Sequence, residues 1–299
     1  MLPAAAVDFK RRRVSWPFQW LWMRVMANLD MVVHLRRCGS DSPAIAIALA
    51  LAKRLQAHLL GLYLVPLAPA AFASPEAVAL HVGESDKLFR DAEAQATWWS
   101  GLLAEQGING EFQVAQGESV DSLCHASRWC DVVVVERPIL NPDAPVGWGI
   151  VSRTVFGASA PVMVVPDTTK LRETGKNVLV AWNGSREAML AMRGALPLLR
   201  RAQRVSMVLG DVSPSPLGFS YLPKLDPKAF LARHGIEATF QQMSNDKESG
   251  ATLLDHARAI DADMIVMGAW GSSRISELVL GGATRHLFQH SDIPLLVAH

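Results

Sequence analysis

The sequence predicts an α/β protein made of two tandem units, each an open, mostly parallel five-stranded sheet with helices on both faces. Three observations lead to this prediction. The chain has 299 residues, which at about 100–200 residues per domain favours two domains. Valine-rich runs without alternation, such as residues 131–135, are typical of parallel strands covered on both faces. These strands alternate with helical segments, as right-handed crossover connections require.

The order of elements can be followed along each half. In the first half we expect strands at residues 29–35, 59–65, 112–114, 131–135 and 161–165, with helices at 44–57, 84–106 and 119–129 and one more before the last strand. In the second half we expect strands at residues 177–181, 204–209, 238–242, 263–268 and 294–298, with helices at 186–202, 227–234, 248–260 and from the turn at 281–284 through 290.

The second half repeats the first. The run Asp-Val-Val-Val-Val at residues 131–135 corresponds to Asp-Met-Ile-Val-Met at 263–267, and residues 161–165 correspond to 294–298. Self-similarity of this kind indicates an internal duplication. We therefore expect a first domain at residues 29–167 and a second at 176–299, preceded by an extension at 1–28.

The extension has an unusual composition. Residues 1–28 hold five basic side chains and one acidic one, and the basic run precedes a short apolar stretch at 16–23. This stretch is interrupted by Pro17 and Gln19 and is too short for a bilayer, which needs about 20 apolar residues. The segment suits a membrane-surface anchor. The favoured alternative is an upstream start codon, with Met26 as the natural first residue.

Charge and cysteine content exclude some functions. The chain has a net charge of +1, and residues 1–28 contribute +4, so the remainder is mildly acidic at −3. Such a body argues against nucleic-acid binding. The cysteines Cys38, Cys124 and Cys130 form no metal-binding spacing and indicate reduced thiols in a cytoplasmic protein. No segment is long enough to span a membrane, and no metal site is evident.

Two loops in the second half follow predicted strands, where ligands bind in open parallel sheets. One contains Gly268 and Gly271 and continues to the Gly-Gly-Ala-Thr turn at 281–284, which opens a helix. Glycines permit close backbone approach, and free amides at a helix start attract anions, so these glycines form either an anion site or only tight turns. In the other loop, Ser185 is expected to cap a helix, while the role of Asn183 stays open.

The three glycines have the spacing of a known nucleotide-binding pattern. Gly268 is followed by two residues, Gly271, nine residues and Gly281. With this motif the chain resembles the universal stress protein family, whose Rossmann-like domain, of the adenine nucleotide alpha hydrolase type, would occur twice within residues 29–299. The family pattern continues with Ser or Thr, where this chain has Gly282, although Thr284 follows closely.

The resemblance implies a stress-response protein that binds ATP, ADP or AMP in its second domain for a regulatory role. In the family the glycine loop contacts ribose and phosphates. The turn after the first strand usually places an Asp near the adenosine, where this chain has Asn183, and Asp211 would lie by the adenine. The nucleotide-binding residues expected from the resemblance are Asn183, Asp211, Met267, Gly268, Gly271, Gly281, Gly282, Ala283 and Thr284.

The first half lacks this motif. Its fourth strand is followed by Glu136, Arg137 and Pro138, and proline cannot donate an amide hydrogen bond. A carboxylate at Glu136 would also repel a phosphate. We expect a degenerate site there, with Arg36 and Arg37 in a solvated charged turn.

Two alternative functions remain. One is a nucleotide-free interaction module, since some family members act through dimers in which the last strand pairs across the interface. In a tandem chain the two halves would instead pair internally. The other alternative is a weak ATP hydrolase, for which we identify no nucleophile, general base or other catalytic residue.

Overall fold

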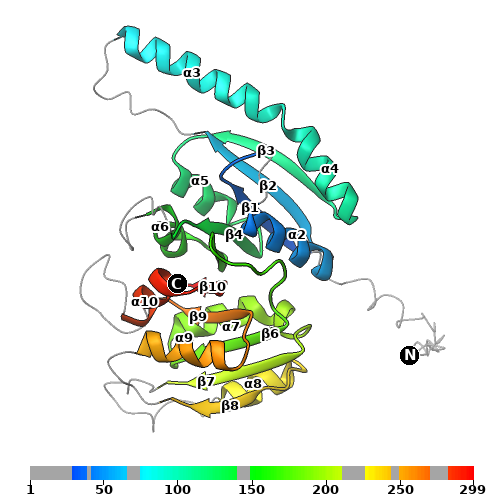
Figure 1. Cartoon of the computed structure of the whole chain (residues 1–299), viewed down its shortest axis with the longest axis vertical. Helices are drawn as coiled ribbons and strands as arrows, with labels where there is room; N and C mark the ends of the chain where they lie inside the picture. The colour runs from blue at the N-terminus through cyan, green and yellow to red at the C-terminus, as the bar shows by residue number, and fades with distance from the viewer. Residues whose placement is uncertain are drawn as a thin grey trace, which may run out of the picture.

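The computed structural model describes residues 29–38, 42–65, 75–139, 149–210, 226–243, 249–269 and 282–299. The extension at residues 1–28 lies outside the described residues. Strands and helices alternate within each half, except that two helices follow each other between the second and third strands of the first half, and the α/β fold class is confirmed (Figure 1).

The described strands of both halves form one continuous ten-stranded sheet, in the order β3-β2-β1-β4-β5-β10-β9-β6-β7-β8. All neighbouring pairs are parallel except β5 and β10, which are antiparallel. The strands are β1 (Asp30–Leu35), β2 (His58–Val65), β3 (Gly110–Gln116), β4 (Val132–Arg137), β5 (Val162–Pro166), β6 (Asn177–Trp182), β7 (Arg204–Leu209), β8 (Thr239–Gln242), β9 (Met264–Gly268) and β10 (Leu295–Ala298).

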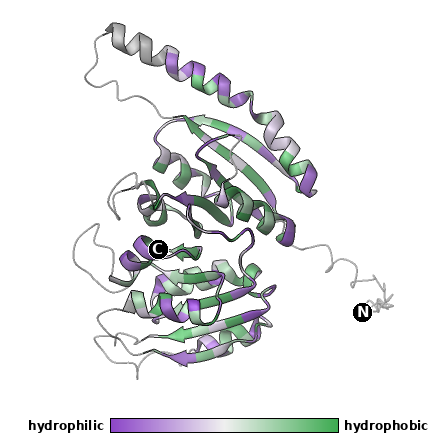
Figure 2. Ribbon diagram, viewed as in Figure 1, coloured by the Kyte–Doolittle hydropathy of each residue, from purple (hydrophilic) through white to green (hydrophobic). Residues whose placement is uncertain are grey.

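Helices cover both faces of this sheet, and each face has its own apolar core. The first core includes buried side chains of α2 (Pro43–Leu55), α4 (Ala96–Gln106), α7 (Arg186–Leu199) and α8 (Pro227–Arg233). The second includes those of α5 (Ser119–Ala126), α6 (Ile150–Gly157), α9 (Ser249–Ala259) and α10 (Gly282–His290). Figure 2 shows the strands at the centre of the sheet as predominantly hydrophobic, because a sheet covered on both faces buries successive side chains on each side.

The prediction of one long helix at residues 84–106 is wrong, because the structure has two helices in this part of the chain. Helix α3 (Pro75–Glu93) ends at a turn in which the amide of Gln95 donates to the carbonyl of Ala92, and α4 follows. The break directs α4 onto the sheet, where Trp99 is almost fully buried against Gly61 of β2. A side chain at Gly61 would meet the Trp99 ring at 2.6 Å, so the glycine makes this packing possible.

Strand β10 joins the two halves. It pairs antiparallel with β5 through Leu295–Val164, Leu296–Met163 and Val297–Val162, and all six side chains are buried. The last strand of the second half is therefore paired within the chain, which is one of the two arrangements that the sequence left open.

This internal pairing leads to a prediction about the oligomeric state. Because both strands at the centre of the sheet have their partners within one chain, we expect a monomer. Sedimentation velocity is expected to give one species near 32.5 kDa. A concentration-independent species of twice that mass would contradict the prediction.

Candidate functional site

The second half of the sheet has a topological switch point between β6 and β9. From β6 the chain proceeds outward to β7 and β8, whereas β9 and β10 lie on the other side of β6. The crevice at the carboxyl ends of two such strands is where open α/β sheets bind ligands. Val180 pairs with Val266, so in a parallel register Trp182 lies level with Gly268. Asn183 and Gly268 therefore end neighbouring strands at one edge of the sheet.

The turn after β6 is held by local hydrogen bonds. The Ser185 hydroxyl accepts from the amide of Ala188 at 3.1 Å and caps α7, as predicted. The side-chain oxygen of Asn183 accepts from the Ser185 amide at 3.1 Å, and Gly184 between them has a φ of +75°, which favours glycine. Asn183 thus has a structural role in the turn, which stabilises the start of α7 next to the switch point.

Gly268 lies against the first turn of α7. A Cβ added there would lie 2.4 Å from the amide nitrogen of Ala188 and 2.6 Å from the carbonyl carbon of Glu187. These are backbone atoms that cannot rotate away, so the glycine is required for packing. The preceding Met267 is 5% exposed and its side chain belongs to the second core. At these two positions, only backbone groups remain to contact a ligand.

The start of α10 lies at the same edge, because this helix leads back to β10, which runs parallel to β9. Gly282 is exposed, and a Cβ there would meet nothing within 4 Å. Ala283 packs against Gly250 of α9, and Thr284 is 4% exposed. The first amide groups of a helix have no partners within it, and the helix dipole makes this end attractive to anions.

Six of the nine predicted site residues are thus described, and they lie at or beside the carboxyl edge of the second half. Asp211, Gly271 and Gly281 lie outside the described residues. Sequence reasoning missed two cations in the first turns of the helices, Arg186 of α7 and Arg285 of α10. Both are exposed, and Arg186 lies 3.8 Å from Glu187. The signal in the sequence was an arginine in the first turn of a predicted helix, and guanidinium groups pair well with phosphate.

The equivalent edge of the first half contains an internal ion pair. Glu136 of β4 corresponds in the repeat to Gly268, and Arg36 after β1 corresponds to Asn183. The Glu136 carboxylate accepts a hydrogen bond from the hydroxyl of Ser42, which precedes α2, and lies 3.8 Å from the Arg36 guanidinium. Arg36 and Arg37 are exposed in the turn after β1, as expected, and Arg36 in addition pairs with this carboxylate. The carboxylate therefore lies beside Ser42, the residue that directly precedes α2.

Removing this carboxylate is expected to expose an anion site in the first half. Glu136→Ala removes the carboxylate that lies beside Arg36 and the Ser42 hydroxyl, so inorganic sulfate should bind in its place and stabilise the fold by mass action. We expect sulfate to raise the melting temperature more for Glu136→Ala than for the wild type, at matched ionic strength. Equal shifts in the two proteins would contradict this role of Glu136.

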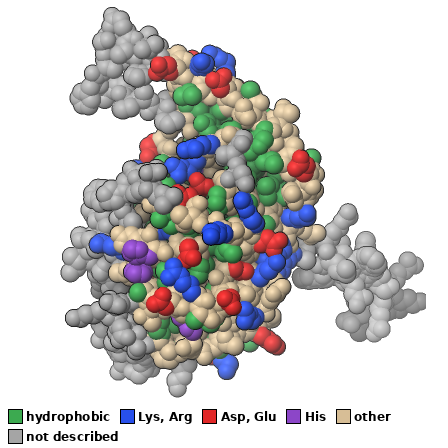
Figure 3. Space-filling view, in the orientation of Figure 1, with side chains coloured by type: hydrophobic (Ala, Val, Ile, Leu, Met, Phe, Trp, Pro, Cys, Tyr) green, Lys and Arg blue, Asp and Glu red, His purple; other side chains and the backbone are tan. Residues whose placement is uncertain are grey.

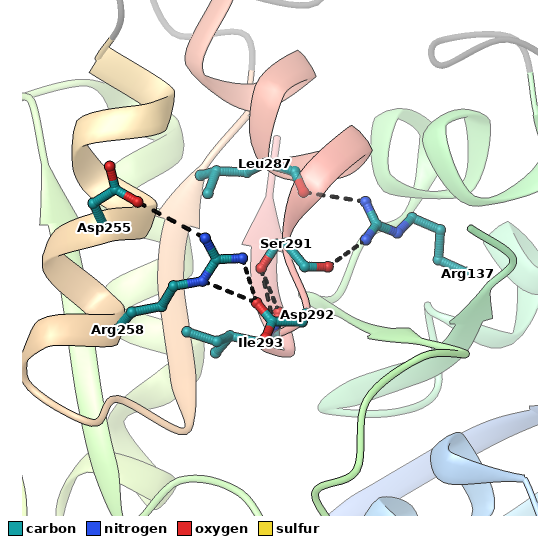
Figure 4. Close-up of polar contacts among 7 residues, drawn as sticks. All are labelled: Arg137, Asp255, Arg258, Leu287, Ser291, Asp292 and Ile293. Atoms are coloured by element: carbon teal, nitrogen blue, oxygen red, sulfur yellow. Dashed lines mark hydrogen bonds and ion pairs between the residues drawn. The ribbon is translucent and has the colours of Figure 1, made fainter. Parts of the chain in front are cut away.

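Arg137, the next residue, links the two halves. It is 5% exposed and extends from β4 to the last turn of α10 and the residue after it, donating to the carbonyl oxygens of Leu287 at 3.1 Å and Ser291 at 2.7 Å (Figure 4). Burial lowers the pKa of Arg137 to about 10, an effect that the nearby carboxylate of Asp167 opposes. A cation at this end of α10 also complements the helix dipole. The first half thereby anchors the helix whose other end forms the candidate anion site.

The properties of the described residues that bear on function are surface charge, possible metal ligands, cysteines and helix hydropathy. On the face in Figure 3, acidic and basic side chains are interspersed rather than separated by sign. Among the described residues, no cluster of three or more His, Cys, Asp or Glu side chains is placed to hold a metal ion. All three cysteines are free, and burial raises the pKa of Cys130 to about 12. None of the helices in the described part of the chain is both long and apolar enough to cross a membrane.

Comparisons with known proteins agree with this architecture. A model of the universal stress protein family matches residues 175–299. A universal stress protein from Archaeoglobus fulgidus DSM 4304 is similar in structure, with a TM-score of 0.66 and 15% identity over 90% of this chain and 97% of that one. A putative universal stress protein from Pseudomonas aeruginosa UCBPP-PA14 has a TM-score of 0.56 and 16% identity, over 91% and 93% of the two chains. No curated protein sequence gives a significant match.

The structural similarities extend over both halves, and at these identities they concern the fold alone. The family model matches the second half of the chain, which carries the glycine motif. Residues 175–299 therefore match the universal stress protein family, and the two halves together share the fold of the similar solved structures.

Proposed function

We propose that the chain is a regulatory stress-response protein of the cytoplasm that binds one adenine nucleotide, ATP, ADP or AMP, in its second half. The observation that carries this proposal is the convergence at the switch point. Gly268 ends β9 beside the turn at Asn183, and the starts of α7 and α10 lie at the same edge. Unpartnered amides, two helix dipoles and the cations Arg186 and Arg285 all favour a phosphate there.

The two halves have different roles in this proposal. We assign residues 29–167 to a domain whose nucleotide site is filled by the Glu136 carboxylate, and residues 176–299 to the domain that binds the ligand. The triphosphate contacts would come from the backbone at Gly268, Gly271 and 281–284, and Asp211 would lie by the adenine. The proposal includes no catalytic step, because no nucleophile or general base is assigned.

The test uses a position that tolerates a side chain. Because Gly282 is exposed and has open space around it, Gly282→Glu should fold while placing a carboxylate at the start of α10. We expect nucleotide affinity, measured by isothermal titration of the full chain, to fall at least about tenfold, corresponding to about 1.4 kcal/mol.

The matched control is Gly101→Glu in α4, where a side chain also meets nothing within 4 Å but which lies in the first half. This variant should bind nucleotide as the wild type does. Unchanged binding in Gly282→Glu would reject the site at α10.

The alternative is a nucleotide-free interaction module. It is favoured by Gly282, which stands where the family motif has a hydroxyl residue. Mass spectrometry of the small molecules released from the purified, denatured chain distinguishes the two functions. About one adenine nucleotide per chain supports the binding protein. An empty chain that is also not stabilised by millimolar ATP supports the module.

A further inference from the structure

A groove of about 660 Å³ crosses the first half, on the face of the sheet that carries α5. Its floor is apolar and consists of side chains from the first three strands, among them Val32, Leu60, Leu62 and Ala115. Helix α5 and the segment after it form one wall, which ends at Trp129. Trp129 is 77% exposed, the largest exposed fraction among the large apolar side chains of the described residues. The volume lies in the range of about 300–1,000 Å³ typical of ligand sites.

The charges around this groove have one sign. Four carboxylates line it, those of Asp30, Glu111, Glu118 and Asp121, and none of its described lining residues is Lys or Arg. Two of the four have a neighbour that contacts them, since Glu118 lies 3.2 Å from the guanidinium of Arg153 and Asp30 lies 3.7 Å from a ring nitrogen of His58. An apolar floor with an acidic border fits a ligand that is both aromatic and cationic.

A segment of the same chain has this chemistry. Residues 9–26 contain Lys10, three consecutive arginines at 11–13 and Arg24, with no acidic residue, and their aromatic side chains include Trp16, Trp20 and Trp22. The segment is joined to the groove by only a few residues, because Asp30, at the start of β1, is itself a lining residue.

We propose that, in the chain that begins at Met1 rather than Met26, this groove binds the basic, tryptophan-rich segment at residues 9–26. The tryptophans would cover the apolar floor beside Trp129, and the arginines would face the carboxylates. The reach is sufficient, because Arg13 lies 17 positions before Asp30 and this stretch extends to about 55–60 Å, whereas the eight residues of β2 span about 26 Å. A short tether of this kind raises the effective concentration of the segment to the millimolar range.

Zero-length cross-linking of the full chain tests the contact directly. A carbodiimide joins an amine only to a carboxylate that touches it, and Lys10 is the lone lysine of the segment. We expect peptides in which Lys10 is joined to Glu111 or Asp121, and we expect their yield to fall at least about fivefold in 1 M salt, where the Debye length is about 3 Å. Cross-links from Lys10 that reach only carboxylates outside the groove, or none, would overturn the proposal.

Hydroxyl-radical footprinting supplies a second readout that does not depend on charge. Trp129 should be oxidised at least about threefold more slowly in the full chain than in a variant with Trp16, Trp20 and Trp22 replaced by Ser. The matched control is Leu88 of α3, which is 51% exposed, outside the groove, and should react equally in both proteins. Equal oxidation of Trp129 would overturn the proposal, and binding of the full chain to anionic vesicles in that case would assign the segment to a membrane surface.

Discussion

Replacing Arg137 by Ala is expected to lower the free energy of unfolding by about 3 kcal/mol, because two buried hydrogen bonds from a charged donor are lost. The carbonyl of Leu287 keeps only its bond from the Ser291 amide. Each hydrogen bond from a charged donor contributes about 1.5–3 kcal/mol. Burial of the guanidinium offsets part of this gain, as the lowered pKa of Arg137 indicates. The effect is expected to include both halves, since β4 contributes the side chain and α10 the carbonyls. Urea unfolding followed by fluorescence and circular dichroism measures it.

Arg258 is the matched control for this prediction. It also bonds beside the end of α10, to Asp292 at 2.9 Å, but its side chain is 48% exposed (Figure 4). Exposed ion pairs contribute less than about 1 kcal/mol, so Arg258→Ala should unfold nearly as the wild type does. Arg137→Met separates bonding from packing, because it retains much of the apolar stem without the donors. If Arg137→Met is as stable as the wild type, the link between the halves does not depend on these hydrogen bonds.

Gly268→Ala is expected to destabilise the protein by about 3 kcal/mol, although it adds a single methyl group. Overpacking of a core costs typically about 1–3 kcal/mol, and the upper end applies because the new Cβ meets backbone atoms of Glu187 and Ala188. Relief requires a shift of α7 away from β9. Thermal and urea unfolding of the variant check the magnitude, and a change below about 0.5 kcal/mol would contradict the packing argument.

The control for Gly268 is Gly282, the other described glycine of the two loops that carry the motif. Gly282→Ala adds the same methyl group in open space at the first residue of a helix, so its stability should stay within about 0.5 kcal/mol of the wild type. The contrast bears on how binding data are interpreted. If a Gly268 variant loses nucleotide binding, the cause is either a lost contact with the ligand or a displaced α7. If a Gly282 variant loses binding, a lost contact with the ligand is the cause, because its side chain displaces nothing.

Hydrophobic patterning alone was sufficient to predict the fold class. Strands buried on both faces need uninterrupted apolar runs, as at residues 132–135, and this requirement is local enough to be visible in one chain. The Ser185 cap was predictable for the same reason, since the serine, its helix and the preceding strand are adjacent in sequence. The site itself was only partly predictable. Glycine spacing pointed to the edge of the sheet, but it did not show that Gly268 packs against α7.

The sequence by itself determined the alternation of strands and helices, because this depends on side-chain periodicity and on local turns. The duplication and the edge where we propose that a ligand binds are predictions from the same patterns. Only the tertiary structure decided that the two halves share one sheet through β5 and β10. It also decided that Glu136 pairs with Arg36, that Arg137 bonds to α10, and that an acidic groove borders β1. Each of these contacts joins groups that are far apart in the chain, and it forms only when the helices and strands pack together. A short-range pattern in the sequence therefore does not predict it.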